Sequence, residues 1–560
     1  MTATTRTKSR RASRPVADPG PVGAVPPRRA RPWPLLAAAT AVAVLLAAPL
    51  VFLLVDAAGA GVDTVGSLIG RSLTAQLLWN TVRLAVVVTV LCAVIGTGTA
   101  WLVERTDLPL RRMWAVLLVV PLAIPDFVVS WGWASLSTWV SGFRGAIVVM
   151  TLSLYPLVYL PVASSFRNAD PAQEEVARSL GVGPIRTFLR VTVGQAAVAI
   201  AGGAILVTLV LLAEYGAFEI LGYRTFTTEI FVEYSSSFSI PGASALSIVL
   251  LLLGVAALVG EARLNGRRRV SRSDRMAQRL TTRQHLGAGV VPACLALAAV
   301  VGLALGVPVG SAVHWWLQGT RVSISGQVGL GSAAWHTAAY SAVAAALATG
   351  LALPVAVLSV RHTGWWQRLI ERSTYLVLAM PGIIIALAFS AFSEHYLGGF
   401  EYQQAPMLVL AYAILFFPLA LVGVRTSVAQ APVGLEDVAR SLGQSPVRVW
   451  WRVTRPLVTP GLAAAFCLVF LSCVTELTAT LLLIPTGVQT LATQFWAYET
   501  NLEYGQAAPF ALVMIAIAAV PSYVLGRFFD RLPASSAAGV VPGPGARSGA
   551  PSGVPSEVLA

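Results

Sequence analysis

The sequence contains little charge and almost no lysine. Only 11% of its 560 residues are charged and 56% are hydrophobic, whereas a soluble protein typically has about 25% charged residues. This composition indicates a membrane protein. The net charge of +14 comes from arginine, apart from Lys8. In a membrane-embedded chain basic residues usually report orientation, so nucleic acid is not an expected partner.

The scarcity of lysine also bears on catalysis. A phosphate-binding loop of the form GxxxxGK[ST] needs a lysine, and Lys8 lies in no such loop. The four cysteines lie in apolar stretches without metal-ligand spacing, the five histidines are scattered, and no HExxH or GxSxG motif occurs. We therefore expect no enzyme activity, no catalytic residue, no metal site and no cofactor bound by this chain.

Long apolar stretches recur along the chain. A helix needs about 20 mostly apolar residues to cross a bilayer core of roughly 30 Å. Twelve stretches qualify, so the predicted fold class is an all-α polytopic membrane protein with about 12 transmembrane helices. They are Pro34–Val55, Thr81–Val103, Met113–Leu136, Gly145–Ala163, Ala196–Leu212, Ile240–Gly260, Gly287–Val309, Thr337–Val360, Tyr375–Phe392, Pro406–Val424, Leu462–Ile484 and Pro509–Leu525.

The arginines predict the orientation of these spans. Twelve spans place both termini on one side, and assigning alternate loops accordingly puts 34 basic residues inside and five outside. Because cytoplasmic loops carry the excess of basic residues, both termini are predicted to be cytoplasmic in a plasma (inner) membrane. The five outside residues are Arg71, Arg83, Arg144, Arg224 and Arg321.

The same features predict five segments. Residues 1–33 form a basic tail, which we expect to be disordered and cytoplasmic, and residues 34–260 a first transmembrane domain. Residues 261–285 form a basic cytoplasmic linker with eight arginines, and residues 286–532 a second transmembrane domain. Residues 533–560, rich in Pro, Gly, Ser and Ala, are expected to be a disordered cytoplasmic tail.

An internal repeat relates the two transmembrane domains. Glu174–Thr192 reads EEVARSLGVGPIRTFLRVT and Glu436–Thr454 reads EDVARSLGQSPVRVWWRVT, with twelve of nineteen positions identical at an offset of 262 residues. Earlier matches, including Pro125 with Pro381, have an offset of 256. The chain is therefore two tandem six-helix halves. Because six is even, both copies of the loop are predicted to face the cytoplasm.

Each copy has the features of two short helices joined by a turn. Two acids begin the first helix, where carboxylates interact favourably with the helix dipole. Gly181 and Gly443 are placed to end it with a positive φ, and Pro184 and Pro446 suit the first turn of a second, arginine-bearing helix. One interpretation is a pair of interfacial helices on anionic lipid. Lipid binding, however, would not require the same Gly and Ala in both copies, so a docking surface for another protein is favoured.

The loops resemble a known motif: E-A-A, three residues, G, nine residues, then I-x-L-P, found in permease subunits of binding-protein-dependent ABC importers. The matching positions are Glu175, Val176, Ala177, Gly181 and Val191 in the first copy, and Asp437, Val438, Ala439, Gly443, Val453 and Pro456 in the second. Val replaces the middle Ala in both copies, Asp437 replaces Glu, and Gly194 and Arg455 depart from the end of the motif.

Two further stretches resemble the fused double permeases of the iron(III) type, namely AEYGAFEILGYRTFTT (213–228) and TELTATLLLIPTGVQTLATQFW (475–496). The resemblance implies a bacterial type I importer permease that transports solute delivered by an extracytoplasmic binding protein. Fe(III) is the best guess for the solute, and relatives carry thiamine or 2-aminoethylphosphonate. It also implies that two copies of a cytoplasmic ATPase, which bind ATP and Mg²⁺, dock on the loops. The implied coupling residues are Glu174, Glu175, Ala177, Gly181, Glu436, Asp437, Ala439 and Gly443.

Three acids within or beside apolar spans are candidates for the translocation pathway. An unpaired charge inside a membrane costs roughly 2.5 kcal/mol or more, so Asp126, Glu214 and Glu476 must face protein or water. Glu214 and Glu476 occupy equivalent positions and could flank a pathway near its outer mouth. The alternative is that they cap helix ends or pair with Arg83 or backbone groups.

A secondary transporter of the major facilitator class remains the rival prediction. It too has twelve spans in two halves with a basic central linker. That class usually shows a Gly-, Asp- and Arg-rich signature between spans two and three, whereas this loop reads ERTDLPLRR. It also has no evident use for two matching loops. We therefore favour the ABC permease.

Overall fold

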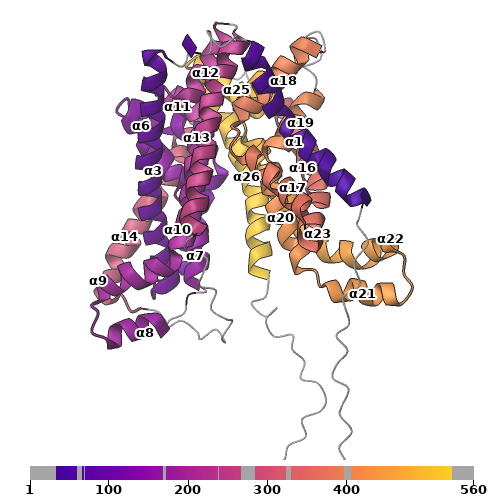
Figure 1. Ribbon diagram of the computed structural model, residues 1–560. Helices are drawn as coiled ribbons and strands as arrows, with labels where there is room; N and C mark the ends of the chain where they lie inside the picture. Colours follow the sequence, from indigo (N-terminus) through magenta and orange to yellow (C-terminus); the bar gives the residue numbers. More distant parts are fainter. Residues whose placement is uncertain are drawn as a thin grey trace, which may run out of the picture.

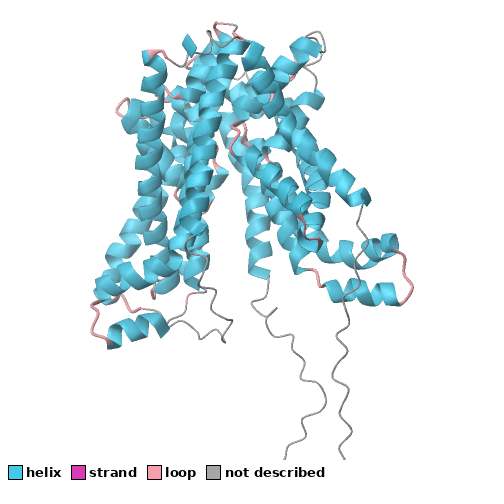
Figure 2. Ribbon diagram, in the orientation of Figure 1, coloured by secondary structure: helices cyan, strands magenta, loops and turns pink. Residues whose placement is uncertain are grey.

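The computed structural model describes a helical membrane protein. It covers residues 33–59, 66–67, 70–167, 169, 172–237, 239–266, 284–322, 329–362, 364–396 and 405–531. Within these ranges there is no strand, only an isolated bridge between Thr106 and Gln284. The all-α fold class is confirmed (Figure 2). Residues 1–32 of the tail predicted at 1–33, the whole tail predicted at 533–560, and residues 267–283 of the predicted linker lie outside the described residues.

The helices follow the order of the repeat. The first half contains α1 (Trp33–Gly59), α3 (Ser72–Arg105), α4 (Arg111–Leu117), η1 (Val120–Ala123), α5 (Asp126–Ala134), α6 (Gly142–Leu154), α7 (Pro156–Arg167), α8 (Ala172–Ser179), α9 (Pro184–Thr187), η2 (Phe188–Thr192), α10 (Val193–Ala213), α11 (Gly216–Ile220), α12 (Phe226–Ser235) and α13 (Ile240–Gly266).

The second half repeats most of this pattern. It contains η3 (Gly287–Gly289), α14 (Val290–Val301), η4 (Gly302–Gly306), α15 (Val307–Val322), α16 (Leu330–Arg361), α17 (Trp365–Leu378), α18 (Gly382–Tyr396), α19 (Ala405–Leu415), α20 (Phe417–Gln430), α21 (Val433–Ser441), α22 (Pro446–Val449), η5 (Trp450–Thr454), α23 (Arg455–Val474), α24 (Thr478–Leu483), α25 (Leu491–Thr500) and α26 (Tyr504–Arg531).

The number of spans depends on how broken helices are counted. Among the described residues, eight helices are long and apolar enough to cross a membrane, or ten if each of two bent pairs is one span. Two shorter apolar helices, Gly382–Ser393 and Tyr504–Ala519, stand at the remaining predicted places. These segments follow the order of the twelve predicted stretches.

Several predicted spans have different limits or are divided in the structure. The span predicted at 462–484 runs instead over Pro446–Val474, because the second helix of the loop continues into it through η5, and α24 is separate. The stretch predicted at 375–392 is divided between α17 and α18. Proline accounts for this second break, since Pro381 has no backbone N–H to donate.

Pro125 breaks the third span in the same way. The helices Arg111–Ala123 and Asp126–Ala134 meet at an angle of 92°, and Pro125 occupies the N-cap of α5. Its φ of −57° and ψ of 138° are those of extended backbone before a new helix. The break at Pro125 places Asp126 at a helix start.

The two hydrophobic cores each combine residues from both halves. One consists largely of residues from α16 to α20 and α23, and also includes Leu46 of α1 and Leu250 of α13. The other consists largely of residues from α3, α5, α6 and α7, and also includes Leu297 of α14 and Met514 of α26. The first and last helices of each half thus pack against the other half. The two hydrophobic cores therefore do not coincide with the two halves of the sequence repeat.

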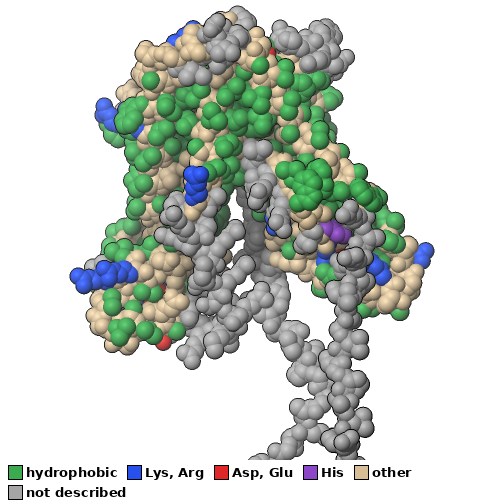
Figure 3. Space-filling model, viewed as in Figure 1, with side chains coloured by type: hydrophobic (Ala, Val, Ile, Leu, Met, Phe, Trp, Pro, Cys, Tyr) green, Lys and Arg blue, Asp and Glu red, His purple; other side chains and the backbone are tan. Residues whose placement is uncertain are grey.

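The helices form two arms that diverge toward one end of the molecule. In Figure 1, α8 and α9 lie at the lower end of one arm, and α21 and α22 at the lower end of the other. Hydrophobic side chains cover much of the visible outer face of the helical body, while several Arg side chains lie around the lower loops (Figure 3). Both copies of the repeated loop are thus at the same end.

Close packing of α7 against α10 depends on a glycine, which gives a first prediction. A Cβ on Gly203 would lie 2.7 Å from the Cα of Val158, whereas one on Gly202 would meet nothing within 4 Å. Replacing Gly203 with Ala should therefore destabilise the protein by about 1–3 kcal/mol through overpacking. Gly202→Ala should be neutral or stabilising, because Ala favours helix over Gly by roughly 0.5–1 kcal/mol.

The measurement is thermal unfolding of the two purified variants in the same detergent. A lower Tm for Gly203→Ala only is the expected result. Equal midpoints for both variants would contradict this account of the α7 and α10 contact.

Candidate functional site

The repeated loops have the same local fold in both halves. Loop 1 (residues 172–192) consists of α8, a turn at Gly181, α9 and η2, and loop 2 (residues 433–454) consists of α21, a turn at Gly443, α22 and η5. The predicted arrangement of a short helix, a glycine turn and a second helix is confirmed. The second helix, however, runs without interruption into α10 or α23.

Each turn is a helix C-terminal motif that requires positive φ. Gly181 and Gly443 both have φ of 77°. The N–H of Gly443 donates to the carbonyl of Arg440 (2.9 Å) and that of Gln444 to Ala439 (3.1 Å), and Gly181 and Val182 form the same two bonds in loop 1. These are the paired bonds of the Schellman motif. The glycines therefore fix the angle between the two helices of each loop.

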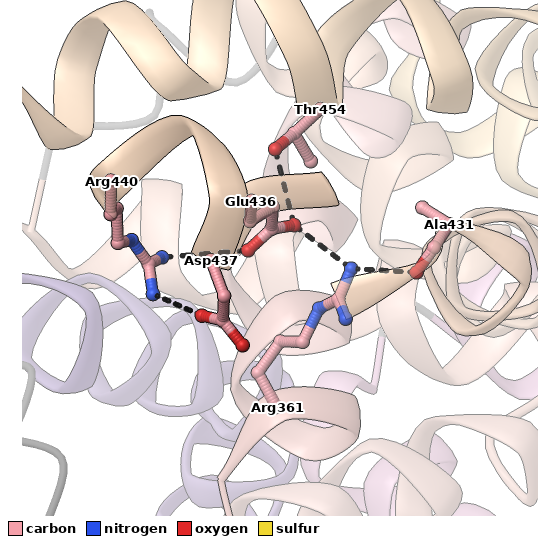
Figure 4. Close-up of polar contacts among 6 residues, drawn as sticks. All are labelled: Arg361, Ala431, Glu436, Asp437, Arg440 and Thr454. Atoms are coloured by element: carbon pink, nitrogen blue, oxygen red, sulfur yellow. Dashed lines mark hydrogen bonds and ion pairs between the residues drawn. The ribbon is translucent and has the colours of Figure 1, made fainter. Parts of the chain in front are cut away.

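A buried ion pair fastens loop 2 to the membrane span α16 (Figure 4). Glu436 Oε1 accepts hydrogen bonds from Arg361 Nη2 (3.0 Å) and from Thr454 Oγ1 (3.1 Å). Arg361 Nη2 also donates to the carbonyl oxygen of Ala431 (3.0 Å). The side chains of Arg361 and Glu436 are only 8% and 11% exposed. Arg440 approaches Glu436 Oε2 at 3.4 Å from the exposed side.

Loop 1 is fastened to α3 by the equivalent residues. Glu174 Oε1 accepts from Arg105 Nη2 and from Thr192 Oγ1 (2.8 Å), and both charged side chains are buried. A buried charge is tolerated only when it is paired and hydrogen-bonded. Glu174 and Glu436 therefore hold the loops in place and do not face outward.

Arg105 and Arg361 were missed by the sequence analysis, although a signal was present. They are separated by 256 residues, the offset already found for Pro125 and Pro381. Thr192 and Thr454 are the last identical residues of the repeat, and the sequence predicted no role for them. Each is the last residue of a π-helical turn, η2 or η5, and these turns lie at the same place in both halves. π-Helical turns occur mostly as single bulges and often at functional sites.

The outward faces of the loops carry apolar side chains. Val176 and Val438 are each 57% exposed, and Leu180 and Leu442 are 77% and 75% exposed. Of the other predicted coupling residues, Glu175, Asp437, Gly181 and Gly443 are exposed and Ala177 and Ala439 half-buried. Each loop thus presents an exposed valine and leucine on a helix whose orientation is fixed from behind by a buried ion pair.

The three predicted pathway acids come together where the halves meet. A Cβ on Gly216 would lie 2.6 Å from Leu477 and 3.0 Å from Phe127, so the neighbours of Glu476 and Asp126 both contact the segment that follows Glu214. Glu214 is within electrostatic reach of both other acids. A Cβ on Gly382, which takes the place of Asp126 in the second half, would lie 2.9 Å from Glu476 Oε1.

Two of these acids cap short helices. Glu214 Oε1 accepts from the N–H of Ala217 (2.8 Å) and Glu476 Oε1 from that of Ala479 (2.9 Å). The observed contacts of Glu214 and Glu476 are therefore those of helix caps, as the alternative in the sequence analysis predicted. Arg83 instead donates to the Tyr223 hydroxyl (3.0 Å) and lies over the ring of Phe143. Within the described part of the chain, no group of three or more His, Cys, Asp or Glu residues could hold a metal ion.

Comparison with known proteins gives a family match in both halves. The family described as "binding-protein-dependent transport system inner membrane component" matches residues 85–270 and 324–534. The chain is 35% identical over 487 residues to the Fe(3+)-transport system permease protein FbpB 2 of Haemophilus influenzae, covering 86% of this chain and 96% of that protein.

More distant relatives match one half or show lower identity. The ferric transport system permease protein FbpB of Actinobacillus pleuropneumoniae is 21% identical over 81% of this chain and 71% of its own length. The putative 2-aminoethylphosphonate transport system permease protein PhnV of Salmonella typhimurium is 29% identical over 36% of this chain and 78% of its own length.

The buried ion pair in loop 2 gives a second prediction. Arg361→Met should cost about 3–5 kcal/mol, because it leaves Glu436 buried without its cation. Arg440→Met, which removes an arginine that is 45% exposed, should cost less than about 1 kcal/mol. The measurements are thermal unfolding and the rate of protease cleavage within loop 2. Similar losses in both variants would contradict the assigned difference between the two arginines.

Proposed function

The chain belongs to the family of binding-protein-dependent transport system inner membrane components, and we propose that it is the whole transmembrane pathway of an ATP-driven ferric iron importer. Members of this family are transport subunits that work with a solute-binding protein and an ATPase. Membership excludes the rival prediction of a major facilitator transporter. It also identifies the chain as a multi-pass inner membrane permease.

The observation that carries the proposal is the pair of matched loops at one end of the molecule (Figure 1). Each has the same glycine turn, the same buried Glu–Arg–Thr contacts and the same exposed Val–Leu pair. Two equivalent surfaces fit two copies of one partner. We infer that two ATPase subunits bind there, one on each loop, and that they bind ATP and Mg²⁺ while this chain binds neither.

The proposed orientation follows from charge. The loops carry Arg186, Arg190, Arg448 and Arg452, and Gln284, at the end of the arginine-rich linker, pairs with Arg105, the residue that holds loop 1. Because basic residues concentrate on the cytoplasmic side, the end of the molecule that carries the loops and both termini are proposed to be cytoplasmic. Lipid surrounds the apolar flank of the helical body.

The proposed mechanism transmits motion through the buried ion pairs. When ATP draws the two ATPase subunits together, each loop moves with its subunit. Arg105 and Arg361 then carry that motion into α3 and α16, because a buried ion pair cannot separate without a large cost. Since each core contains helices from both halves, the arms reorient together and open the pathway to the outside. Hydrolysis lets them return.

The proposed solute is Fe(III), and the proposal rests on the names of the similar permeases and on the acidic residues between the halves. A permease named for Fe(3+) transport covers nearly the whole chain, whereas the permease named for 2-aminoethylphosphonate covers about a third. Asp126, Glu214 and Glu476 meet between the halves, and carboxylates suit the passage of a cation. Selection of iron is assigned chiefly to the binding protein.

A third prediction concerns the exposed leucines. A double variant, Leu180→Asp with Leu442→Asp, places a charge on each proposed docking surface and should abolish co-purification of the ATPase while membrane insertion is unchanged. The control is Leu502→Asp, because Leu502 is 71% exposed and lies between α25 and α26, and α25 is at the end away from the two loops (Figure 1). Retention of the ATPase by the double variant would contradict the docking role.

A fourth prediction tests the solute. In proteoliposomes that contain the permease with its ATPase, Fe(III)-loaded binding protein should stimulate ATP hydrolysis and ⁵⁵Fe uptake. Binding protein without iron, or loaded with another trivalent metal, serves as the control. Stimulation by thiamine or 2-aminoethylphosphonate with their own binding proteins, and none by Fe(III), would replace iron as the solute while leaving the importer function in place.

A further inference from the structure

The start of the second half is bound to the cytoplasmic end of α3. Thr106 and Gln284 form the isolated parallel bridge. The N–H of Gln284 donates to the carbonyl of Arg105 (2.8 Å), and the N–H of Asp107 donates to the carbonyl of Gln284 (3.2 Å). We name residues 105–107 and 284–286 together the strap. It joins the exit of the linker directly to the first half.

The carboxylate of Asp107 closes the strap. Its Oδ1 accepts from the backbone N–H of Leu286 (2.9 Å), and its Oδ2 contacts Nδ1 of His285. The Leu286 N–H, followed by His285, holds the pKa of Asp107 below its usual value. A depressed pKa means that these contacts favour the ionised form, so they are present at neutral pH and lost as pH falls through the folded pKa. Leu286 also packs against the core of the first half.

The strap shares a residue with the fastening of loop 1. The backbone of Arg105 pairs with Gln284, while its side chain holds Glu174. Although Arg105 is 3% exposed, its Nη1 has no hydrogen-bond partner among the described residues. In loop 2, by contrast, Arg361 has the Ala431 carbonyl as a second acceptor. Loop 1 thus has the poorer side-chain fastening and an additional backbone one.

The second half has no equivalent of Asp107. The position 256 residues later is Thr363, which has no carboxylate. No bridge involving Arg361 occurs in the ranges that the structure covers. The two loops are therefore alike on their outward faces but are fastened differently from behind.

We propose that Asp107 is a positioning residue for loop 1, which acts through the strap by fixing the backbone of Arg105 and hence the position of Glu174. The inference rests on the proposed function, because the position of loop 1 matters only if the loop transmits motion. It predicts that substitution of Asp107 increases the mobility of loop 1 but not that of loop 2. Loop 1 depends on the strap in addition to Arg105 and Thr192, whereas loop 2 is held by Arg361 and Thr454 without a strap.

The internal repeat supplies a matched pair of reporters for the fifth prediction. Val176 and Val438 are equivalent residues with the same exposure of 57%, so a spin label at either site samples the same surface. In the full-length permease without ATPase, Asp107→Ala should raise the mobile fraction of the label at position 176 at least about twofold and leave position 438 unchanged. Glu503→Ala, which removes an exposed carboxylate at the other end, is the control.

Two further variants separate positioning from a general loss of structure. Asp107→Asn keeps an acceptor for the Leu286 N–H and should give an intermediate mobility. In the double variant Asp107→Cys with His285→Cys, oxidation should restore low mobility at position 176 and reduction should raise it again. The oxidised and reduced forms share one sequence, so their difference cannot come from misfolding during synthesis.

The effect on coupling is measured separately. In the complex with ATPase and binding protein, Asp107→Ala should reduce substrate-stimulated ATP hydrolysis by about two- to tenfold, and oxidation of the double-cysteine variant should restore it. Equal changes in label mobility at positions 176 and 438, or no change at either, would contradict the claim that the strap positions loop 1, even if both loops couple ATP hydrolysis to transport. If Asp107→Ala raised the mobility of the label at position 176 only, but left substrate-stimulated ATP hydrolysis unchanged, the positioning role of Asp107 would be overturned. If the Leu180→Asp and Leu442→Asp double variant kept the ATPase, the docking role on which the proposed function depends would be removed instead.

Discussion

One interaction governs the arrangement of both loops, namely a buried carboxylate paired with a buried guanidinium. Glu174 and Glu436 begin helices whose other charged side chains are exposed, yet they point inward to Arg105 and Arg361. Each pair has given up its hydration, so neither partner can leave without an uncompensated charge remaining behind. This constraint fixes each loop to one particular span, α3 or α16. A loop held only by exposed ion pairs could change its position at little cost.

The second constraint is the exchange of helices between the halves. α1 packs in a core formed mainly by the second half, and α14 packs in one formed mainly by the first. Neither half can therefore move as an independent body. Motion that begins at one loop reaches helices of both halves, which suits a transporter that must open on one side as it closes on the other. The strap adds a third connection between the halves, and among the described residues it occurs beside loop 1 and not beside loop 2.

The acids between the halves show that the repeat has diverged where the two halves meet. Glu214 and Glu476 keep the same capping contact with the residue three positions later. Asp126, however, is replaced by Gly382, and a side chain at Gly382 would collide with Glu476. The first half thus places a carboxylate at position 126, whereas the absence of a side chain at Gly382 leaves space for the carboxylate of Glu476. The carboxylates between the halves are accordingly not arranged symmetrically, although the surrounding helices follow the repeat.

The sequence by itself determined the membrane class, the two halves, the loops and their glycine turns, because these depend on composition and on local patterns of a few residues. Gly181, Gly443, Pro184 and Pro125 act within one turn of chain, so their consequences could be predicted without a fold. Only the tertiary structure decided that Glu174 and Glu436 are buried, that α1 and α14 cross to the opposite half, and that Asp107 meets Leu286. Those contacts join residues that are 69 to 179 positions apart or that lie in different spans. Their partners are determined by the packing of the helices, which cannot be inferred from a local sequence pattern.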